Sequence, residues 1–169
     1  MKEDAVRALV KALEEKEIPG NIRDEKDFEQ RFVEPICVEH LERVQPKLEI
    51  AVHPWGDPKK AKAWAESKIW AAVTAWGMKH TFDLHARVPD DTWHMAVEVK
   101  LAKAKGGKSF TGDFQRMMGQ CHLAKLRHDV VLGVFGYIGD LKETPTKVRD
   151  YEAELREREG IWVVVLKVG

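Results

Sequence analysis

The chain has 169 residues, of which 44% are hydrophobic, and its 28 lysines and arginines balance 28 acidic residues to a formal net charge of zero. These values predict one domain with its own core, residues 1–169, and argue against a general nucleic-acid coat protein. No apolar run approaches a membrane span, and the first residues predict an amphipathic helix without a signal-peptide core. We therefore expect a cytoplasmic protein without a membrane partner, whose Cys37 and Cys121 are reduced thiols.

Hydrophobic periodicity and turn residues predict a mixed series of helices and strands. Pro35 should kink or restart the second helix, because proline lacks the amide hydrogen that a helix interior needs. The expected order is helix 2–17, helix 24–43, strand 47–53, helix 59–76, a hairpin over 82–101, helix 110–127, strand 130–138, helix 146–159 and strand 161–168.

The hairpin over 82–101 is the most informative segment. Its turn is predicted at residues 89–92, where Pro89 suits the entry to a tight turn and aspartates can bond the backbone. With Asp90 and Asp91 as the loop, residues whose numbers sum to about 181 face each other. One face of the hairpin then carries only apolar pairs: Phe82 with Val99, Leu84 with Val97, Ala86 with Met95 and Val88 with Trp93.

The opposite face carries two acids. In this register Asp83 lies directly opposite Glu98, with Lys100 one step along the same face. Like charges so placed destabilise a sheet pair by roughly 0.2–1 kcal/mol. A divalent cation between the carboxylates would remove this cost, and Lys100 would then orient or deprotonate a water for attack. The alternative is an exposed face with solvated charges.

Asp83, fourteen intervening residues and then Glu98-Val99-Lys100 resemble the PD-(D/E)-x-K motif of nucleases with the restriction-endonuclease-like fold. Other acid-x-Lys triplets occur in the chain, but only this one lies in a strand-like apolar run behind a facing Asp. Phe82 stands where the motif has proline, a departure that the loosely patterned family tolerates. The resemblance implies an α/β fold with a mixed β-sheet flanked by helices, in the core order αβββαβ with helix 59–76 inserted.

The same resemblance implies a metal-dependent endonuclease that hydrolyses DNA phosphodiester bonds. Asp83, Glu98 and the Val99 carbonyl would bind Mg²⁺ or Mn²⁺. A homodimer or a larger protein partner would supply specificity. The alternative is a non-catalytic nucleic-acid-binding or assembly module on the same fold.

Two helices are expected to complete the site. Glu29 lies at the centre of the apolar stripe of helix 24–43, an unusual place because burying an unpaired carboxylate is expensive. The resemblance implies that a helix glutamate completes the metal site, with Glu29 as the first candidate and Glu25 as the second. Glu29 could instead bond a structural arginine or reach solvent. In helix 110–127 the resemblance implies a polar side chain that reaches the site, and Gln120 and Arg116 are the candidates.

Basic residues gather after the expected catalytic strand. From Lys100 to His128 there are seven lysines and arginines and a single acid, Asp113, which makes a local positive field. The glycine- and lysine-rich loop in this segment is predicted to contact nucleic-acid phosphates. The alternative is a loop that keeps the protein soluble. The predicted phosphate contacts are Lys103, Lys105 and Lys108, with Arg116 on the following helix.

Aromatic and histidine side chains leave further alternatives open. Trp64, Trp70 and Trp76 recur every six residues, so they do not share one helical stripe and at least one is expected to be exposed. They could stack on unpaired bases, or pack in the core or in a dimer. His85 is expected to be a hydrogen-bonded surface residue, with a role beside the metal as the alternative.

Overall fold

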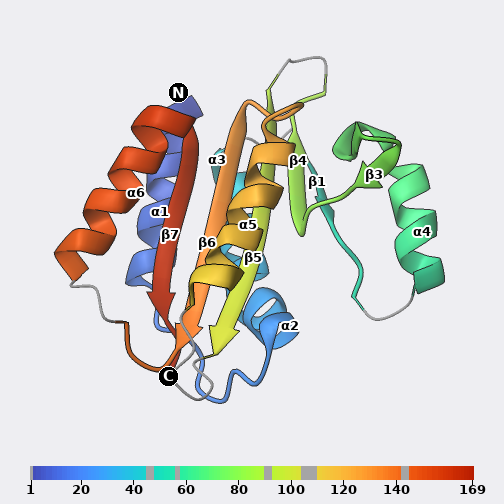
Figure 1. The fold of residues 1–169 in the computed structure, drawn as a ribbon. Coiled ribbons are helices and arrows are strands. Elements are labelled where there is room, and N and C mark those ends of the chain that lie inside the picture. Colours follow the sequence, from blue (N-terminus) through green and yellow to red (C-terminus); the bar gives the residue numbers. More distant parts are fainter. Residues whose placement is uncertain (1, 45–47, 56–57, 90–92, 104–109, 142–144) are drawn as a thin grey trace.

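The computed structural model describes residues 2–44, 48–55, 58–89, 93–103, 110–141 and 145–169. These residues form a mixed α/β structure in which helices flank a five-stranded sheet of order β1-β4-β5-β6-β7 (Figure 1). β1 and β4 are antiparallel, β4 and β5 are antiparallel, and β5, β6 and β7 run parallel. The strands are β1 (Glu49–Val52), β4 (Leu84–Arg87), β5 (His94–Lys103), β6 (Val130–Ile138) and β7 (Ile161–Lys167).

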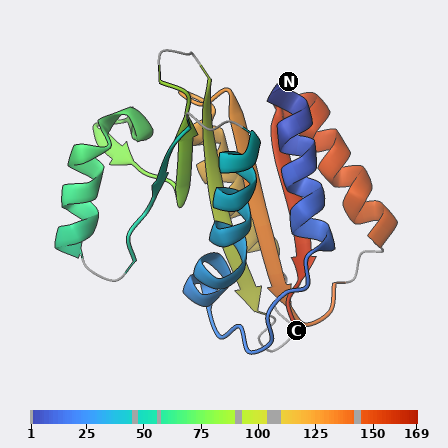
Figure 2. The same ribbon diagram turned by 180° about the vertical axis from the view of Figure 1, so that it is seen from behind.

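Helices cover both faces of the sheet, as the two opposite views show (Figures 1 and 2). Because strand side chains alternate, each face carries its own apolar cluster. One includes Phe32, Val97 and Leu132, and the other includes Met117 and Val131. None of the described helices is long and apolar enough to cross a membrane. The first face is covered by α1 (Lys2–Glu15), α2 (Glu25–Phe28), the π-helical turn η1 (Glu29–Val33) and α3 (Glu34–Val44), and the second by α5 (Thr111–Ala124) and α6 (Pro145–Glu159).

The irregularity predicted at Pro35 is a π-helical turn. The N–H of Glu34 donates to the carbonyl of Glu29, five residues earlier, instead of four. Proline at 35 has no N–H, and its ring would clash with the carbonyl four residues before it in a regular helix, so a wider turn relieves the conflict. The candidate acid Glu29 therefore lies at the start of a distorted turn.

The helix predicted over 59–76 is wrong beyond Ser67. After α4 (Pro58–Ser67) and a short 3₁₀ turn η2 (Ile69–Ala71), the chain forms a separate hairpin of β2 (Val73–Ala75) and β3 (Met78–His80). Trp76 and Gly77 have φ angles of 49° and 74°, which are typical of a two-residue hairpin turn with both residues left-handed. The β-branched residues just before this turn favour a strand over a helix.

The predicted register of the main hairpin is confirmed where β4 and β5 pair. Leu84 lies opposite Val97, and Ala86 lies opposite Met95. The turn is predicted at residues 89–92, of which 90–92 lie outside the described residues.

Gly136 in β6 allows the first-face helices to approach the sheet closely. A Cβ at this position would lie 2.8 Å from Cε1 of Phe28 and 3.0 Å from Cδ1 of Leu101. A larger residue would therefore push the Phe28 ring away. Since Phe28 directly precedes Glu29, this contact determines how close the π-helical turn lies to β5.

Candidate metal and catalytic site

The candidate site lies where β5 continues beyond the end of β4. The ladder between these strands ends at Leu84, so the backbone N–H groups farther along β5 need other acceptors. The N–H of Val99 donates to Oδ2 of Asp83 at 2.7 Å, and the N–H of Leu101 donates to Oε2 of Glu25 at 3.1 Å. Two carboxylates therefore replace a neighbouring strand at this edge.

The prediction that Asp83 pairs directly opposite Glu98 is wrong, because Asp83 precedes β4 and the pairing of β4 with β5 begins at Leu84 and Val97. The backbone carbonyl of Asp83 accepts a hydrogen bond from the N–H of His53, which follows β1, at 2.8 Å. The backbone is thus bound toward β1, and the side chain alone reaches β5. The Asp83 side chain crosses the gap that opens between the strands beyond Leu84, and it thereby reaches the segment of β5 that carries Glu98.

Glu98 and Glu29 are the deeply buried acids of the site, with exposed fractions of 5% and 2%. Glu98 pairs in register with Gly133 of β6 and lies on the α5 face of the sheet. Oε2 of Glu29 accepts from Nε1–H of Trp55 at 2.6 Å. Oε2 of Glu98 and Oε1 of Glu29 have no hydrogen-bond partner within the described part of the chain. An unsatisfied buried polar group costs roughly 1–3 kcal/mol, which a bound cation would offset.

Burial and mutual repulsion raise the pKa of the three acids. Burial raises the pKa of Glu98 to about 10 and that of Glu29 to about 9, and the charge of Asp83 adds to both shifts. Burial also raises the pKa of Asp83 to about 7, although its hydrogen bond from Val99 acts in the opposite direction. Glu98 and Glu29 therefore hold protons at neutral pH in the metal-free protein. Clustered groups with perturbed pKa values are typical of functional sites.

Lys100 lies beside these acids, as predicted. Its Nζ is 2.7 Å from Oε2 of Glu25, and its charge lowers the pKa of both Asp83 and Glu98. Glu25 therefore binds Lys100 and also accepts the N–H of Leu101. It links α2 to β5, whereas Glu29 bonds Trp55 and has a second oxygen without a hydrogen-bond partner among the described residues.

The described acids offer a hard cation at most two carboxylates and a backbone carbonyl, so water would have to supply the remaining ligands. No group of three or more His, Cys, Asp or Glu side chains, among those that the structure describes, could hold a metal ion as arranged. Asp83, Glu98 and the Val99 carbonyl form a smaller set, since N–H and C=O of one strand residue point to the same side. Mg²⁺ typically binds proteins through one or two carboxylates and keeps several waters.

The other predicted site residues lie farther from this cluster or remain untested. Gln120 is half-buried and Arg116 is exposed on α5, and neither is hydrogen-bonded to the acids in the described segments. Lys103 is exposed at the end of β5, and its Nζ donates to the carbonyl of Arg23. Lys105 and Lys108 lie outside the described residues.

His85 is fully buried, so the expectation of a surface histidine is wrong. Its Nε2 accepts the N–H of Phe82 at 3.1 Å, and its Nδ1 lies 3.2 Å from Nε2 of His128. Nδ1 of His128 lies 2.9 Å from the carbonyl of Ala124, which requires a proton on that nitrogen. Both rings are therefore neutral, and burial lowers the pKa of His85 to about 3. His85 supports the turn that positions Asp83.

Trp55 is the contributor to the site that sequence reasoning missed. It lies in a Pro-Trp-Gly segment that is typical of a strand end, and its partner Glu29 is 26 residues away. No local pattern in the sequence connects the two. The contact becomes visible only when β1 and the π-helical turn are placed in space.

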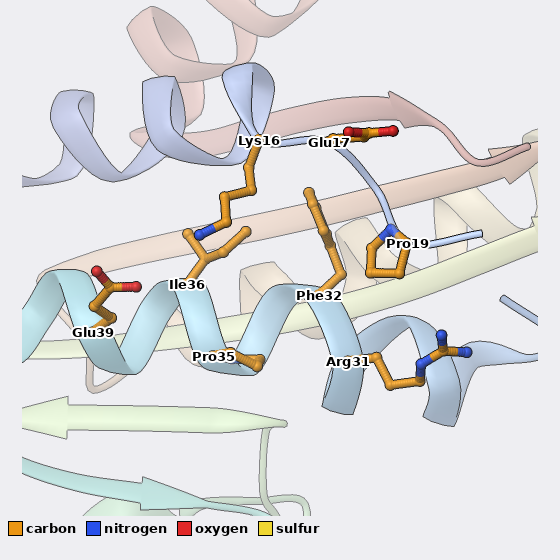
Figure 3. A pocket seen from close by; sticks show the side chains of 8 residues that line it. All are labelled: Lys16, Glu17, Pro19, Arg31, Phe32, Pro35, Ile36 and Glu39. Carbon is orange, nitrogen blue, oxygen red and sulfur yellow. The ribbon is translucent and has the colours of Figure 1, made fainter. Parts of the chain in front are cut away.

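A separate pocket lies between the end of α1 and the turn η1, and no acid of the cluster lines it (Figure 3). Its walls combine apolar side chains with charges of both signs, so it has no single-sign field that would attract one class of charged ligand. The lining residues are Lys16, Glu17, Pro19, Arg31, Phe32, Pro35, Ile36 and Glu39.

Comparison of the chain with protein-family models, curated proteins and solved structures finds no match. A function must therefore be inferred from the residues and their geometry.

Proposed function

We propose that this chain is a metal-dependent nuclease that hydrolyses DNA phosphodiester bonds, similar to the PD-(D/E)-x-K group. The observation that carries the proposal is the pair of buried carboxyl oxygens without a partner among the described residues, Glu98 Oε2 and Glu29 Oε1. The charge of Asp83 acts on both glutamates, and the charge of Lys100 acts on Glu98. A purely structural domain gains no stability from such acids, because burial of an unpaired carboxyl group is unfavourable.

We also infer a restriction-endonuclease-like core. The elements α3, β1, β4, β5, α5 and β6 follow one another in the order that the resemblance implies, and residues 58–80 form an insertion between β1 and β4. The candidate acids lie at the divergence of β4 and β5, next to the first-face helices. This arrangement supports the proposal because Glu98 and Lys100 lie on β5, the middle strand of the sheet.

Each residue has a distinct role in this proposal. Asp83, Glu98 and the Val99 carbonyl would hold Mg²⁺ or Mn²⁺ together with water, and Glu29 lies outside this set, because no three of the described acids could hold a metal ion as arranged. When bound, the cation supplies Lewis-acid chemistry, which makes water more acidic and offsets charge on the phosphate. Glu98 would bind the cation only in its ionised form, since ligating carboxyl groups must be deprotonated. Lys100, held by Glu25, orients the attacking water and places positive charge beside the phosphate.

The test is incubation of supercoiled plasmid and synthetic single-stranded and branched DNA with Mg²⁺ or Mn²⁺. We expect metal-dependent cleavage that falls by at least about 100-fold in Asp83→Ala, Glu98→Ala and Lys100→Ala, with circular dichroism showing a retained fold. Glu42→Gln is a matched control, because this glutamate is exposed on α3 and lies outside the acid cluster. It should cleave like the wild type.

The negative outcomes separate the alternatives. DNA binding without cleavage under any metal condition would replace the enzyme with a nucleic-acid-binding or assembly module. Absence of both binding and cleavage would leave a structural domain. A crystal soaked in Mn²⁺ gives an independent result, because the proposal requires anomalous signal between Asp83 and Glu98.

A further inference from the structure

Residues 58–80 form a projection beyond the β1 edge of the sheet, on the side opposite β7 (Figures 1 and 2). It consists of α4, η2 and the β2–β3 hairpin. The chain enters it just after Trp55, which donates to Glu29, and leaves it just before Asp83. Both ends of the projection are therefore anchored at the acid cluster.

Two of the three tryptophans hold the projection against the sheet. The Trp64 ring lies 5.0 Å from that of His53 and 5.8 Å from that of His85, measured between centroids. The guanidinium of Arg87 lies over the Trp70 ring, with its Cζ 4.6 Å from the ring centroid. These contacts pack α4 and η2 against β4 and the residue that follows β1, and the β2–β3 hairpin extends from this packed part.

Trp76, the third tryptophan, lies at the tip of the hairpin with 82% of its surface exposed, next to Met78 at 59%. It occupies the first position of the two-residue turn at a φ of 49°. Asn, Asp and Gly are favoured there because they adopt left-handed conformations with little strain. The indole therefore supports neither the turn nor the core, and it presents a large apolar ring to solvent.

The projection is basic although the whole chain is neutral. Residues 58–80 contain five lysines and one acid, Glu66. The side chains of Lys62 and Lys79 are exposed, and Lys79 is in the same hairpin as Trp76. Such a field attracts phosphates, and aromatic rings among basic residues are typical of surfaces that bind single strands.

We propose that residues 58–80 bind unpaired DNA bases next to the acid cluster, with Trp76 stacked on a base and Lys62 and Lys79 on the phosphates. The inference rests on the proposed nuclease function, for which it names the substrate class: DNA with a single-stranded part. Every base has a face that stacks on an indole, so the surface selects strand structure and not sequence. Bases in an intact duplex already stack on one another and leave Trp76 without a partner.

The length of the connecting chain limits the distance between this surface and the acids. Trp76 precedes Asp83 by seven residues, so the two Cα atoms are at most about 25 Å apart. A stacked DNA strand rises about 3.4 Å per nucleotide. A straight, stacked strand would cover this distance in about seven nucleotides.

The test measures binding of the full chain in EDTA, so cleavage does not interfere. Fluorescence anisotropy compares a labelled dT oligonucleotide of about 20 nucleotides with a duplex of the same length. We expect tighter binding of the single strand and quenching of indole fluorescence. Trp76→Asn should weaken single-strand binding by about 5- to 150-fold while thermal unfolding shows an intact fold, because Asn suits this turn. Lys62→Gln and Lys79→Gln should each make the salt dependence shallower by about 0.7 in log–log slope.

Tyr151→Ala is the matched control, because Tyr151 is an exposed aromatic on α6, at the other side of the sheet. It should leave binding unchanged. Unaltered single-strand affinity in Trp76→Asn would overturn the inference, as would equal binding of duplex and single strand. Trp76-dependent self-association, or Trp76-dependent binding to phosphatidylserine vesicles without an effect on DNA, would assign the tip to a different partner and also overturn it. If DNA is cleaved but its binding does not depend on Trp76, the proposed nuclease function stands and the inference about residues 58–80 falls. If binding depends on Trp76 but no DNA is cleaved, the inference stands and the nuclease function falls.

Discussion

Glu98 should make the metal-free protein less stable as the pH rises, and Glu98→Gln should remove this dependence. Burial, together with the charge of Asp83, raises the pKa of Glu98 from 4.5 to about 10. Below pH 4.5 the group is protonated in both the folded and the unfolded state, so it adds no pH-dependent cost. Above that pH the unfolded chain releases the proton while the folded protein keeps it, and the free energy of unfolding falls by about 1.4 kcal/mol per pH unit.

At pH 7 the accumulated loss from Glu98 is about 3 kcal/mol, since pH 7 lies 2.5 units above the unfolded pKa of 4.5. This magnitude does not depend on how far above 7 the folded pKa lies. Glutamine has nearly the same shape and stays neutral at every pH. The stability of Glu98→Gln relative to the wild type should therefore rise by about 3 kcal/mol between pH 4.5 and 7.

Urea unfolding from pH 4.5 to pH 8 in EDTA, followed by circular dichroism, measures this difference. Mn²⁺ should stabilise the wild type more strongly at pH 8 than at pH 5, because binding requires ionised carboxyl groups, and the gain should be about 2.7 kcal/mol at 100 times the dissociation constant. Glu98→Gln should lose this gain, whereas the exposed control Glu42→Gln should keep it. A stability difference that stays constant with pH, or an undiminished Mn²⁺ effect in Glu98→Gln, would refute the reasoning.

Three further predictions concern the support of the site. Trp55→Phe should lower the free energy of unfolding by about 1–2 kcal/mol, because Glu29 loses its hydrogen bond; the loss should disappear in a Glu29→Met background, which has no acceptor for the indole N–H, if the two groups act as a pair. Gly136→Ala should cost about 1–3 kcal/mol in thermal unfolding, since its Cβ would lie 2.8 Å from the Phe28 ring, and Phe28→Leu in the same chain should recover part of this cost. The His85 ring should stay neutral down to about pH 4 in ¹⁵N NMR. Because its folded pKa of about 3 lies below the unfolded value of 6.5, its contribution to stability should fall as the pH drops below 6.5; a midpoint near 6.5 in the folded protein would contradict this prediction.

Much of the candidate site could be predicted because strand geometry is periodic. Alternation of side chains determined which residues of the hairpin share a face, and the pairing of Leu84 with Val97 confirms the register. The position of Glu29 within an apolar stripe correctly predicted a buried acid. The metal, the substrate and the roles of Gln120 and Arg116 stay predictions.

Errors arose where the backbone leaves a regular element. Asp83 lies just before β4, so the pairing rule that holds from Leu84 onward does not apply to it. The tail of the segment predicted as helix 59–76 contains alanines and tryptophans that tolerate a helix, yet it forms a hairpin. The turn residues Trp76 and Gly77 both have positive φ angles, but the sequence indicates this turn only weakly, because tryptophan is not a typical residue of such a turn.

The sequence by itself determined most of the helices and strands outside residues 68–80, the register of β4 on β5 and the presence of Glu98 and Lys100 on one face of β5, since these follow from backbone periods of 2 and about 3.6 residues. Only the tertiary structure decided which distant groups meet them: Glu25 joins Lys100 across 75 positions, and Trp55 joins Glu29 across 26. Such meetings depend on how closely one helix packs on the sheet, here through Phe28 over Gly136. The distance between the helix and the sheet depends on the volumes of side chains that are far apart in the sequence, so no local sequence pattern predicts it.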